Sequence, residues 1–167
     1  MKQIIIDLKK NNQIEITEDT EILGLFVGRK QDLLETKLDV IHRKPRLVSN
    51  TAIKAIVYDE AKFDMIGNLV IETGAKFTDA YLRIDVLLMS DEAKARAVPS
   101  LEITEDDVKG GHGATVGQVD REQLFYLQSR GIKLADAEQI LVEGFVQELL
   151  DKVQSKQDLQ KLKSILK

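Results

Sequence analysis

The spacing of hydrophobic residues changes once along this chain, near Gly117, and this change limits the folds open to it. From residue 3 to about residue 118, short apolar runs alternate with polar residues and are separated by Gly, Asn and Asp. A period of two is typical of β-strands. After Gly117 the apolar residues recur at intervals of three and four, as on one face of an amphipathic helix. The pattern predicts a β body over residues 1–118 and a helical segment over residues 119–167.

The β body contains no helical stretch long enough for alternating βαβ units, which argues against a doubly wound α/β fold. Its apolar runs recur roughly every ten residues, a spacing that fits a sandwich, a barrel or a coiled solenoid. No strict repeat of roughly 20 to 50 residues appears, and periodicity alone does not choose among these three folds. The runs include Ile4, Ile6 and Leu8, then Ile14 and Ile16, then Leu23, Leu25 and Val27, followed by residues 38–42, 53–58, 68–72, 81–89 and 100–103.

Local capping signals divide the helical segment into three helices. Asp120 is a good N-cap with Gln123 at the capping-box position, and Gly131 is suited to end that first helix. A second helix is predicted over about residues 136–153, and Ser155 is placed to cap a third. The predicted buried face of the second helix comprises Ala137, Ile140, Leu141, Gly144, Phe145 and Leu149, and that of the third comprises Leu159, Leu162, Ile165 and Leu166.

Composition removes several functional classes. The sequence has no cysteine, which excludes disulfides, thiolate nucleophiles and cysteine-ligated metal centres. With 24 Lys and Arg against 28 Asp and Glu, the net charge of −4 argues against nucleic-acid binding. No window approaches the roughly 20 apolar residues of a membrane span, and the first residues lack the pattern of a signal peptide. We therefore expect a cytoplasmic protein with neither nucleic acid nor membrane as a partner.

The densest unusual stretch is DDVKGGHGATVGQVD, residues 106–120, which we interpret as a glycine-rich loop. A Walker phosphate loop requires a lysine after its glycines, whereas Lys109 precedes them. A Rossmann fingerprint fails as well, because no apolar helix of a βαβ unit follows directly. The glycines instead indicate a tight turn or the close approach of another chain.

His112 is the candidate base or metal ligand of this stretch. Nucleophilic catalysis would pair it with Thr115, but no signature links the two residues. Asp106 and Asp107 could act as a carboxylate pair, although neighbours in a strand point to opposite faces. Glu102 could add a weak oxygen ligand. We favour a hydrogen-bonded structural histidine, or one at an interface, as the interpretation of His112, and His42 is a weaker functional candidate still.

Residues 99–132, PSLEITEDDVKGGHGATVGQVDREQLFYLQSRGI, resemble the signature region of the SufB/SufD family. The resemblance extends upstream through FTDAYLRIDVLLMSDEAKA, residues 77–95, and more faintly to the surroundings of His42. It implies a right-handed parallel β-helix (a β-solenoid) followed by a small C-terminal helical segment. In this family, scaffold chains pair through the β-helix and assemble with the ABC-type ATPase SufC for iron-sulfur cluster assembly.

The sequence departs from the family pattern at three points. Gly110 and Gly111 occupy the positions of the motif's cysteine and serine, so the sulfur is missing although His112 is kept. Residues 84–86, Ile-Asp-Val, stand where Asn-Arg-Asn is expected. Family members are also longer and carry an additional N-terminal region, so the resemblance implies a short SufD-like form without it.

We therefore expect a non-catalytic SufB/SufD-like scaffold subunit, without a cofactor of its own, that forms a homodimer and binds a SufC-like ATPase. Two alternatives stay open: a degenerate structural member without cluster chemistry, and a β-helix enzyme acting on polysaccharide. The 5% aromatic content without Trp argues against sugar stacking in the latter. The expected partner-binding residues are Gly110, Gly111, His112 and Gly113 in the β body, with Leu124, Phe125 and Tyr126 in the helical segment; His112 is also the candidate metal ligand.

Overall fold

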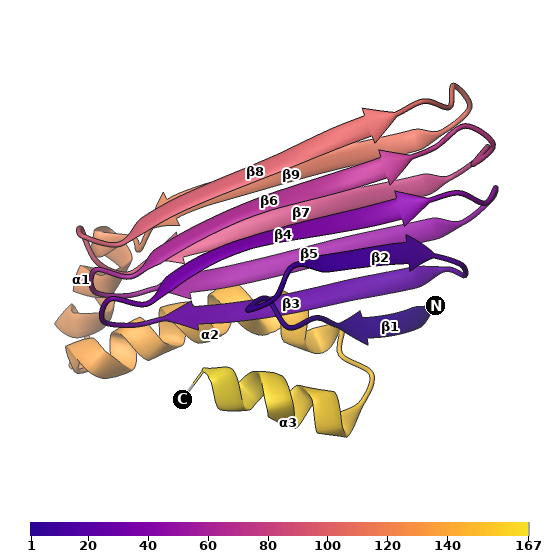
Figure 1. Cartoon of the computed structure of the whole chain (residues 1–167). Helices are drawn as coiled ribbons and strands as arrows, with labels where there is room; N and C mark the ends of the chain where they lie inside the picture. The colour runs from indigo at the N-terminus through magenta and orange to yellow at the C-terminus, as the bar shows by residue number, and fades with distance from the viewer. Residues whose placement is uncertain (167) are drawn as a thin grey trace.

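The computed structural model describes residues 1–166; the predicted helical segment runs one residue further, and Lys167 lies outside the described part. The chain coils into two parallel sheets that face each other, and each pass adds one strand to each sheet (Figure 1). The five-stranded sheet has the order β1-β3-β5-β7-β9 and the four-stranded sheet the order β2-β4-β6-β8. The strands are β1 Lys2–Ile5, β2 Asn12–Ile16, β3 Thr20–Gly28, β4 Leu33–His42, β5 Val48–Val57, β6 Lys62–Ile71, β7 Asp79–Leu88, β8 Lys94–Ile103 and β9 Lys109–Gln118.

This arrangement is a parallel β-solenoid, which confirms the fold class expected from the sequence. The pairing of Thr20 with Ser49 gives a turn of 29 residues, and the pairing of Lys62 with Lys94 gives one of 32. The strands stay in register because the connecting loops absorb this difference in length. A variable turn length explains why no strict repeat appears in the sequence.

The core lies between the two sheets and is built from alternate residues of each strand. Leu38, Met65 and Leu82 are 0% exposed. At the N-terminal end, β1 stops at Ile5, whereas the apolar spacing had predicted a strand continuing through Leu8. Ile6 and Leu8 instead turn into the core beneath Gly24, where a Cβ atom would lie 3.1 Å from Ile6 Cγ1. The absence of a side chain at Gly24 makes room for them.

Three helices follow the last strand: α1 Arg121–Ser129, α2 Leu134–Asp151 and α3 Lys156–Ile165. The predicted caps are confirmed, because Asp120 accepts hydrogen bonds from the backbone N–H groups of residues 122 and 123, and Ser155 accepts one from that of residue 158. Gly131 has a φ of 87°, a conformation that favours glycine. Among residues 1–166, no helix is long and apolar enough to cross a membrane.

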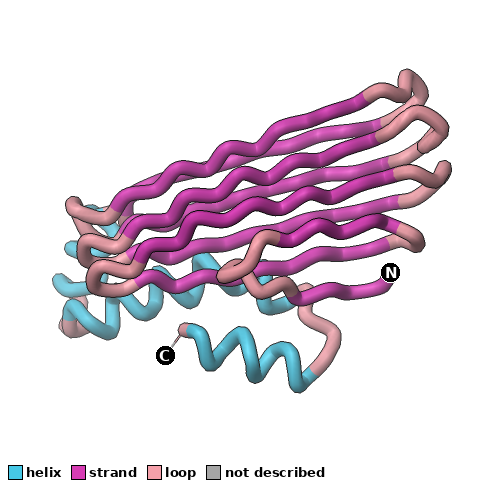
Figure 2. The backbone as a smooth tube through the Cα atoms, viewed as in Figure 1, coloured by secondary structure: helices cyan, strands magenta, loops and turns pink. Residues whose placement is uncertain are grey.

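Helices α2 and α3 lie against the outer face of the five-stranded sheet, and α1 packs against α2 (Figure 2). Leu25 of β3 and Ile56 of β5 point outward and pack with α2 and α3 in a second apolar cluster. The predicted buried face of α2 is wrong in part. Ile140 is 45% exposed, and Val142 and Val146 face the sheet instead, because the apolar strip on β3 and β5 determines which side of the helix is covered. Hydrogen bonds join the Gln3 side chain on β1 to the backbone between α2 and α3.

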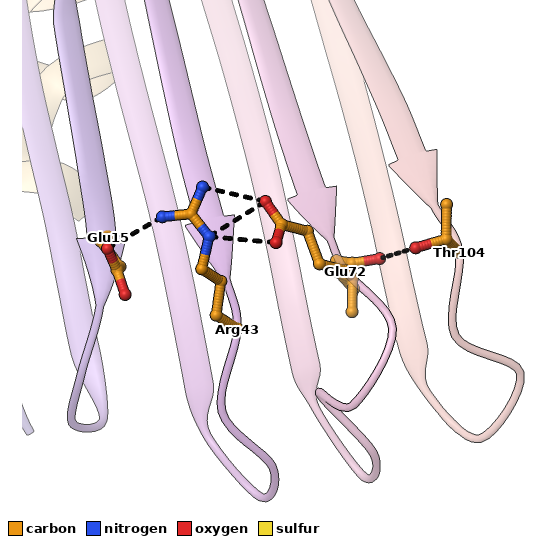
Figure 3. Close-up of polar contacts among 5 residues, drawn as sticks. Glu15, Arg43, Glu72 and Thr104 are labelled. Atoms are coloured by element: carbon orange, nitrogen blue, oxygen red, sulfur yellow. Dashed lines mark hydrogen bonds and ion pairs between the residues drawn. The ribbon is translucent and has the colours of Figure 1, made fainter.

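Side-chain ladders join successive turns of the solenoid. The Arg43 guanidinium lies between two carboxylates, with Nη1 at 3.0 Å from Glu15 and Nε at 3.0 Å from Glu72 (Figure 3). Hydrogen bonding to Glu72 raises the pKa of Arg43. One turn further, the Thr73 hydroxyl donates to the backbone oxygen of Thr104 at 3.1 Å. Such exposed contacts fix the alignment of the turns and contribute little to stability.

Candidate functional site

The glycine-rich stretch is a strand, which corrects its interpretation as a loop. Residues 109–118 pair in parallel with β7 over ten residues and form β9, the last strand of its sheet. Glycine is unfavourable in a strand, but the side chain of Tyr81 fills the space that it leaves. A Cβ atom at Gly111 would lie 2.8 Å from the Tyr81 ring, and one at Gly113 would lie 3.0 Å from the Tyr81 hydroxyl.

The final turn, formed by β8 and β9, leaves one end of the solenoid open. Among residues 1–166 no further strand pairs with the free edge of either strand. Hydrophobic side chains are consequently left uncovered, since Leu101 and Ile103 are each 37% exposed and Val116 is 45% exposed. Exposed strand edges of this kind are normally paired or covered. We call Leu101, Ile103, Val116 and His112 the open end.

His112 belongs to the open end because of its register on β9. It pairs with Leu82, whose side chain is fully buried in the core, so alternation directs His112 toward the same interior side. His112 is nevertheless exposed, because no further turn lies over it. The structure thus places an accessible imidazole at an apolar edge.

Gly110 also faces the interior, beside Ile103 of the same turn and Ile71 of the preceding turn. A Cβ atom at Gly110 would lie 2.6 Å from Ile103 Cδ1 and 3.4 Å from Ile71 Cδ1. A cysteine at this position would therefore place its Cβ atom in the space that Ile103 occupies. The four predicted residues 110–113 thus separate by face, with Gly110 and His112 on the interior side and Gly111 and Gly113 beneath Tyr81.

The carboxylates considered as partners of His112 do not gather around it. Asp106 and Asp107 lie in the turn before β9, where Asp107 Oδ2 is 3.9 Å from Lys76 Nζ. Glu102 lies on β8, where the alternation of the strand places it on the outer face. Across residues 1–166, no three His, Asp or Glu side chains are grouped so that they could hold a metal ion. Metal binding by His112 stays a prediction that would require ligands from another chain.

The second histidine has a structural environment. His42 is fully buried, and its Nε2 atom lies 2.8 Å from the Ser49 hydroxyl oxygen. Its Nδ1 atom has no hydrogen-bond partner among the described residues. Burial disfavours the charged imidazole and lowers the pKa of His42 to about 4. His42 is therefore neutral at pH 7 and inaccessible to a substrate.

The helical segment presents its own surface. Leu124 is only 9% exposed and packs inward, which leaves Phe125 at 73% and Tyr126 at 57% on the outside. Beside them is an open depression of about 490 Å³ between α1 and α2, where Ile140 is also exposed. Its lining combines apolar side chains with two carboxylates and comprises Asp120, Glu122, Gln123, Tyr126, Leu127, Ile140 and Leu141.

Sequence reasoning missed a buried charged residue on the helix-facing side of the five-stranded sheet. Asp85 of β7 is 7% exposed, and its carboxylate contacts Lys54, Arg83 and Thr115. The available signal was an acidic residue within the apolar run of residues 81–89. Its partners could not be identified, because two of them lie 30 or more residues away in the sequence.

The fold and its site define a class of protein: a parallel β-solenoid with one open end and a helical segment packed along one sheet. Residues 5–145 match the family model described as the SufBD core domain of SUF system FeS cluster assembly. This chain belongs to the SufBD core-domain family, which confirms the resemblance recognised in the sequence.

Named relatives support this membership. The chain is 35% identical over 147 residues to the iron-sulfur cluster assembly protein SufD of Escherichia coli, an alignment that covers 86% of this chain and 35% of the relative. It is 32% identical over 147 residues to a SufBD family protein of Synechocystis, covering 88% and 32% respectively. A Pyrococcus horikoshii SufBD family protein is 36% identical over 130 residues, covering 78% and 29%. The chain thus spans about a third of the length of these relatives.

Proposed function

We propose that this protein is a non-catalytic scaffold subunit in iron-sulfur cluster assembly, which forms a homodimer and binds a SufC-like ABC ATPase in the cytoplasm. The observation that carries the proposal is the open end, where an accessible histidine lies among exposed apolar residues on two strands that each have one free edge, in a chain of this family. The names of the relatives support a role in iron-sulfur cluster assembly. The exposed surfaces of this chain support the homodimer contact and the ATPase contact.

Self-association through the open end follows from its chemistry. Two solenoids that meet end to end would cover the exposed side chains of Leu101, Ile103 and Val116 and the free edges of both strands. Gly110, Gly111 and Gly113 would take part in the contact through the free backbone edge of β9. A two-fold axis there would bring both copies of His112 to one interface.

Light scattering with matched valine variants tests this contact. We expect a dimer at tens of micromolar, roughly the range in which weak dimers form, and a monomer for Val116→Glu. Val98→Glu is the control, because Val98 is 37% exposed on β8 but lies on the outer face of its sheet. A monomeric wild type, or a dimeric Val116→Glu variant, would contradict the proposal.

The ATPase contact is proposed for Phe125, Tyr126 and the depression between α1 and α2. Large exposed aromatic side chains beside a concave apolar surface are typical of binding hot spots. Point variants are the appropriate test, because removal of the helices would uncover the apolar strip on the sheet, including Leu25 and Ile56.

Co-purification with a SufC-like ATPase provides the measurement. We expect Phe125→Asp to abolish co-purification and Phe77→Asp to retain it. Phe77 is a comparable control because it is 58% exposed and lies in a turn far from the helices in the sequence. Equal retention by both variants would exclude the helical surface as the docking site.

Gly110, which stands in place of the motif's cysteine, favours a second candidate function. In it, the chain is a structural family member that forms the dimer and binds the ATPase but takes no part in cluster chemistry. Both candidates predict the same two contacts. They differ in cells that lack the corresponding scaffold, where only the first predicts restored activity of iron-sulfur enzymes. The polysaccharide enzyme gains no support, because the carboxylates near His112 are dispersed.

A further inference from the structure

A polar row crosses the outer face of the five-stranded sheet, and its Lys54 end lies beneath helix α2. The strand register places Lys54 of β5 opposite Asp85 of β7, and Asp85 opposite Thr115 of β9. All three side chains point outward, toward the side on which the helices pack. The row therefore reaches from the centre of the sheet to its last strand.

The contacts along the row are continuous. Lys54 Nζ lies 3.8 Å from Asp85 Oδ2, and the Thr115 hydroxyl donates to Asp85 Oδ1 at 2.6 Å. Arg83 adds an ion pair to the same carboxylate at 2.9 Å. From the helix side, the Phe145 ring of α2 covers Lys54, with 4.5 Å between Nζ and the ring centroid.

Because Lys54 and Asp85 are buried, loss of their contact should affect stability more than loss of the exposed contacts that join the turns of the other sheet. The side chains of Lys54 and Asp85 are only 10% and 11% exposed, so neither charge is well solvated if its partner moves away. Removal of one member of a buried ion pair is destabilising, and loss of Lys54 would leave the Asp85 carboxylate with Arg83 as its remaining ion-pair partner. The helix contributes to this burial, since Phe145 lies directly over the ammonium group.

We propose that Asp85 is a positioning residue that couples helix α2 to strand β9 through Lys54 and Thr115. Displacement of α2 uncovers Lys54 and admits water to its ion pair with Asp85, which weakens the hold on Thr115. Loosening of β9 in turn removes the hydrogen bond from Thr115, which leaves the Asp85 carboxylate less firmly positioned against Lys54. The two ends of the row thus respond to each other, whether or not any partner is bound.

The consequence for the proposed function, on which the coupling itself does not depend, concerns His112. The same strand carries Thr115 and His112, so a ligand that shifts α2 would change the mobility of the open end. Coupling of two sites needs an element whose state both sites influence, and this row of contacts supplies a physical candidate.

Hydrogen exchange of the full chain, followed by mass spectrometry, tests the coupling. Lys54→Met removes the ammonium group while keeping an apolar stem, and we expect about tenfold faster exchange in residues 109–116. Lys54 lies on β5, which β7 separates from β9, so a purely local role would leave that segment unchanged. Thr115→Val is the reciprocal variant, at an exposed position that tolerates change, and should accelerate exchange in residues 142–150.

Asp64→Asn is the control for loss of a more exposed ion pair outside the row, because Asp64 accepts from Arg96 at 2.8 Å and so joins β6 to β8 on the other sheet. We expect it to leave both reporter segments unchanged. The proposal is overturned if the effects of Lys54→Met and Thr115→Val stay within their own strands. Equal acceleration in the control, or acceleration spread evenly over β4 and β6, would also overturn it, since general destabilisation would then explain the result.

Discussion

Gly110 of β9 and Ile103 of β8 face each other across the last turn of the solenoid, where a Cβ atom on Gly110 would lie 2.6 Å from Ile103 Cδ1. The position at which the family motif has a cysteine is thus open to a side chain only if one methyl group moves. Because Ile103 is 37% exposed, its side chain can move toward solvent, with some loss of packing.

Double-mutant analysis of this pair should reveal the contact. We expect Gly110→Ala to lower the free energy of unfolding by about 1 kcal/mol, as overpacking commonly does. Ile103→Val deletes the Cδ1 methyl group, and in that background Gly110→Ala should be neutral or stabilising. Urea denaturation measures both changes. Additive effects of the two substitutions would mean that Ile103 does not limit the space at Gly110.

The pH dependence of stability should report on His42. Its pKa is about 4 in the folded protein and ordinarily 6.5, so the unfolded chain binds more protons between these values. The free energy of unfolding should therefore fall as the pH drops from 6.5 to 4, by roughly 3 kcal/mol in total. Urea titrations at several pH values measure this slope.

Two variants test whether His42 causes this pH dependence of the free energy of unfolding. We expect a His42→Leu/Ser49→Ala double variant to lose the dependence over this window, since it removes both members of the buried hydrogen bond. His112→Gln should retain it, because the histidine at the open end is exposed. An unchanged slope in the double variant would show that other groups cause it.

Neighbouring residues of α1 should differ sharply in their effect on stability. Leu124 is 9% exposed, and Leu124→Ala should cost about 2 kcal/mol through lost packing. Phe125 is 73% exposed, and Phe125→Ala should change stability by less than about 0.5 kcal/mol. Thermal and urea unfolding measure both. A large loss for Phe125→Ala would place its side chain in the fold and weaken its assignment to a partner.

The isolated chain is expected not to retain an iron-sulfur cluster. Such clusters are held mainly by cysteine thiolates, and the sequence contains none. Two copies of His112 at a dimer interface would supply imidazole alone. Anaerobic reconstitution with iron and sulfide, followed by desalting and a visible spectrum, measures retention. Stoichiometric cluster absorbance that disappears in His112→Ala would contradict this expectation.

Local sequence patterns were sufficient to predict features that depend only on residues close together in the chain. The period of two predicted strands because alternation alone directs residues to the two faces of a strand. Asp120, Ser155 and Gly131 marked helix ends because each acts on backbone groups within a few residues. The prediction of a solenoid rested on the family resemblance, because a period of two fits several β folds equally well.

Tertiary structure decided the features that depend on distant partners. Residues 109–118 are a strand although they are rich in glycine, because ten residues of β7 pair with them and Tyr81 fills the space above. The buried face of α2 centres on Val142 and Val146 because the sheet beneath it has its apolar strip there. Asp85 contacts Lys54 and Thr115 because turns of 31 and 30 residues bring the three strands into register. The loops between the strands determine the lengths of these turns, so no local sequence pattern predicts which residues become neighbours.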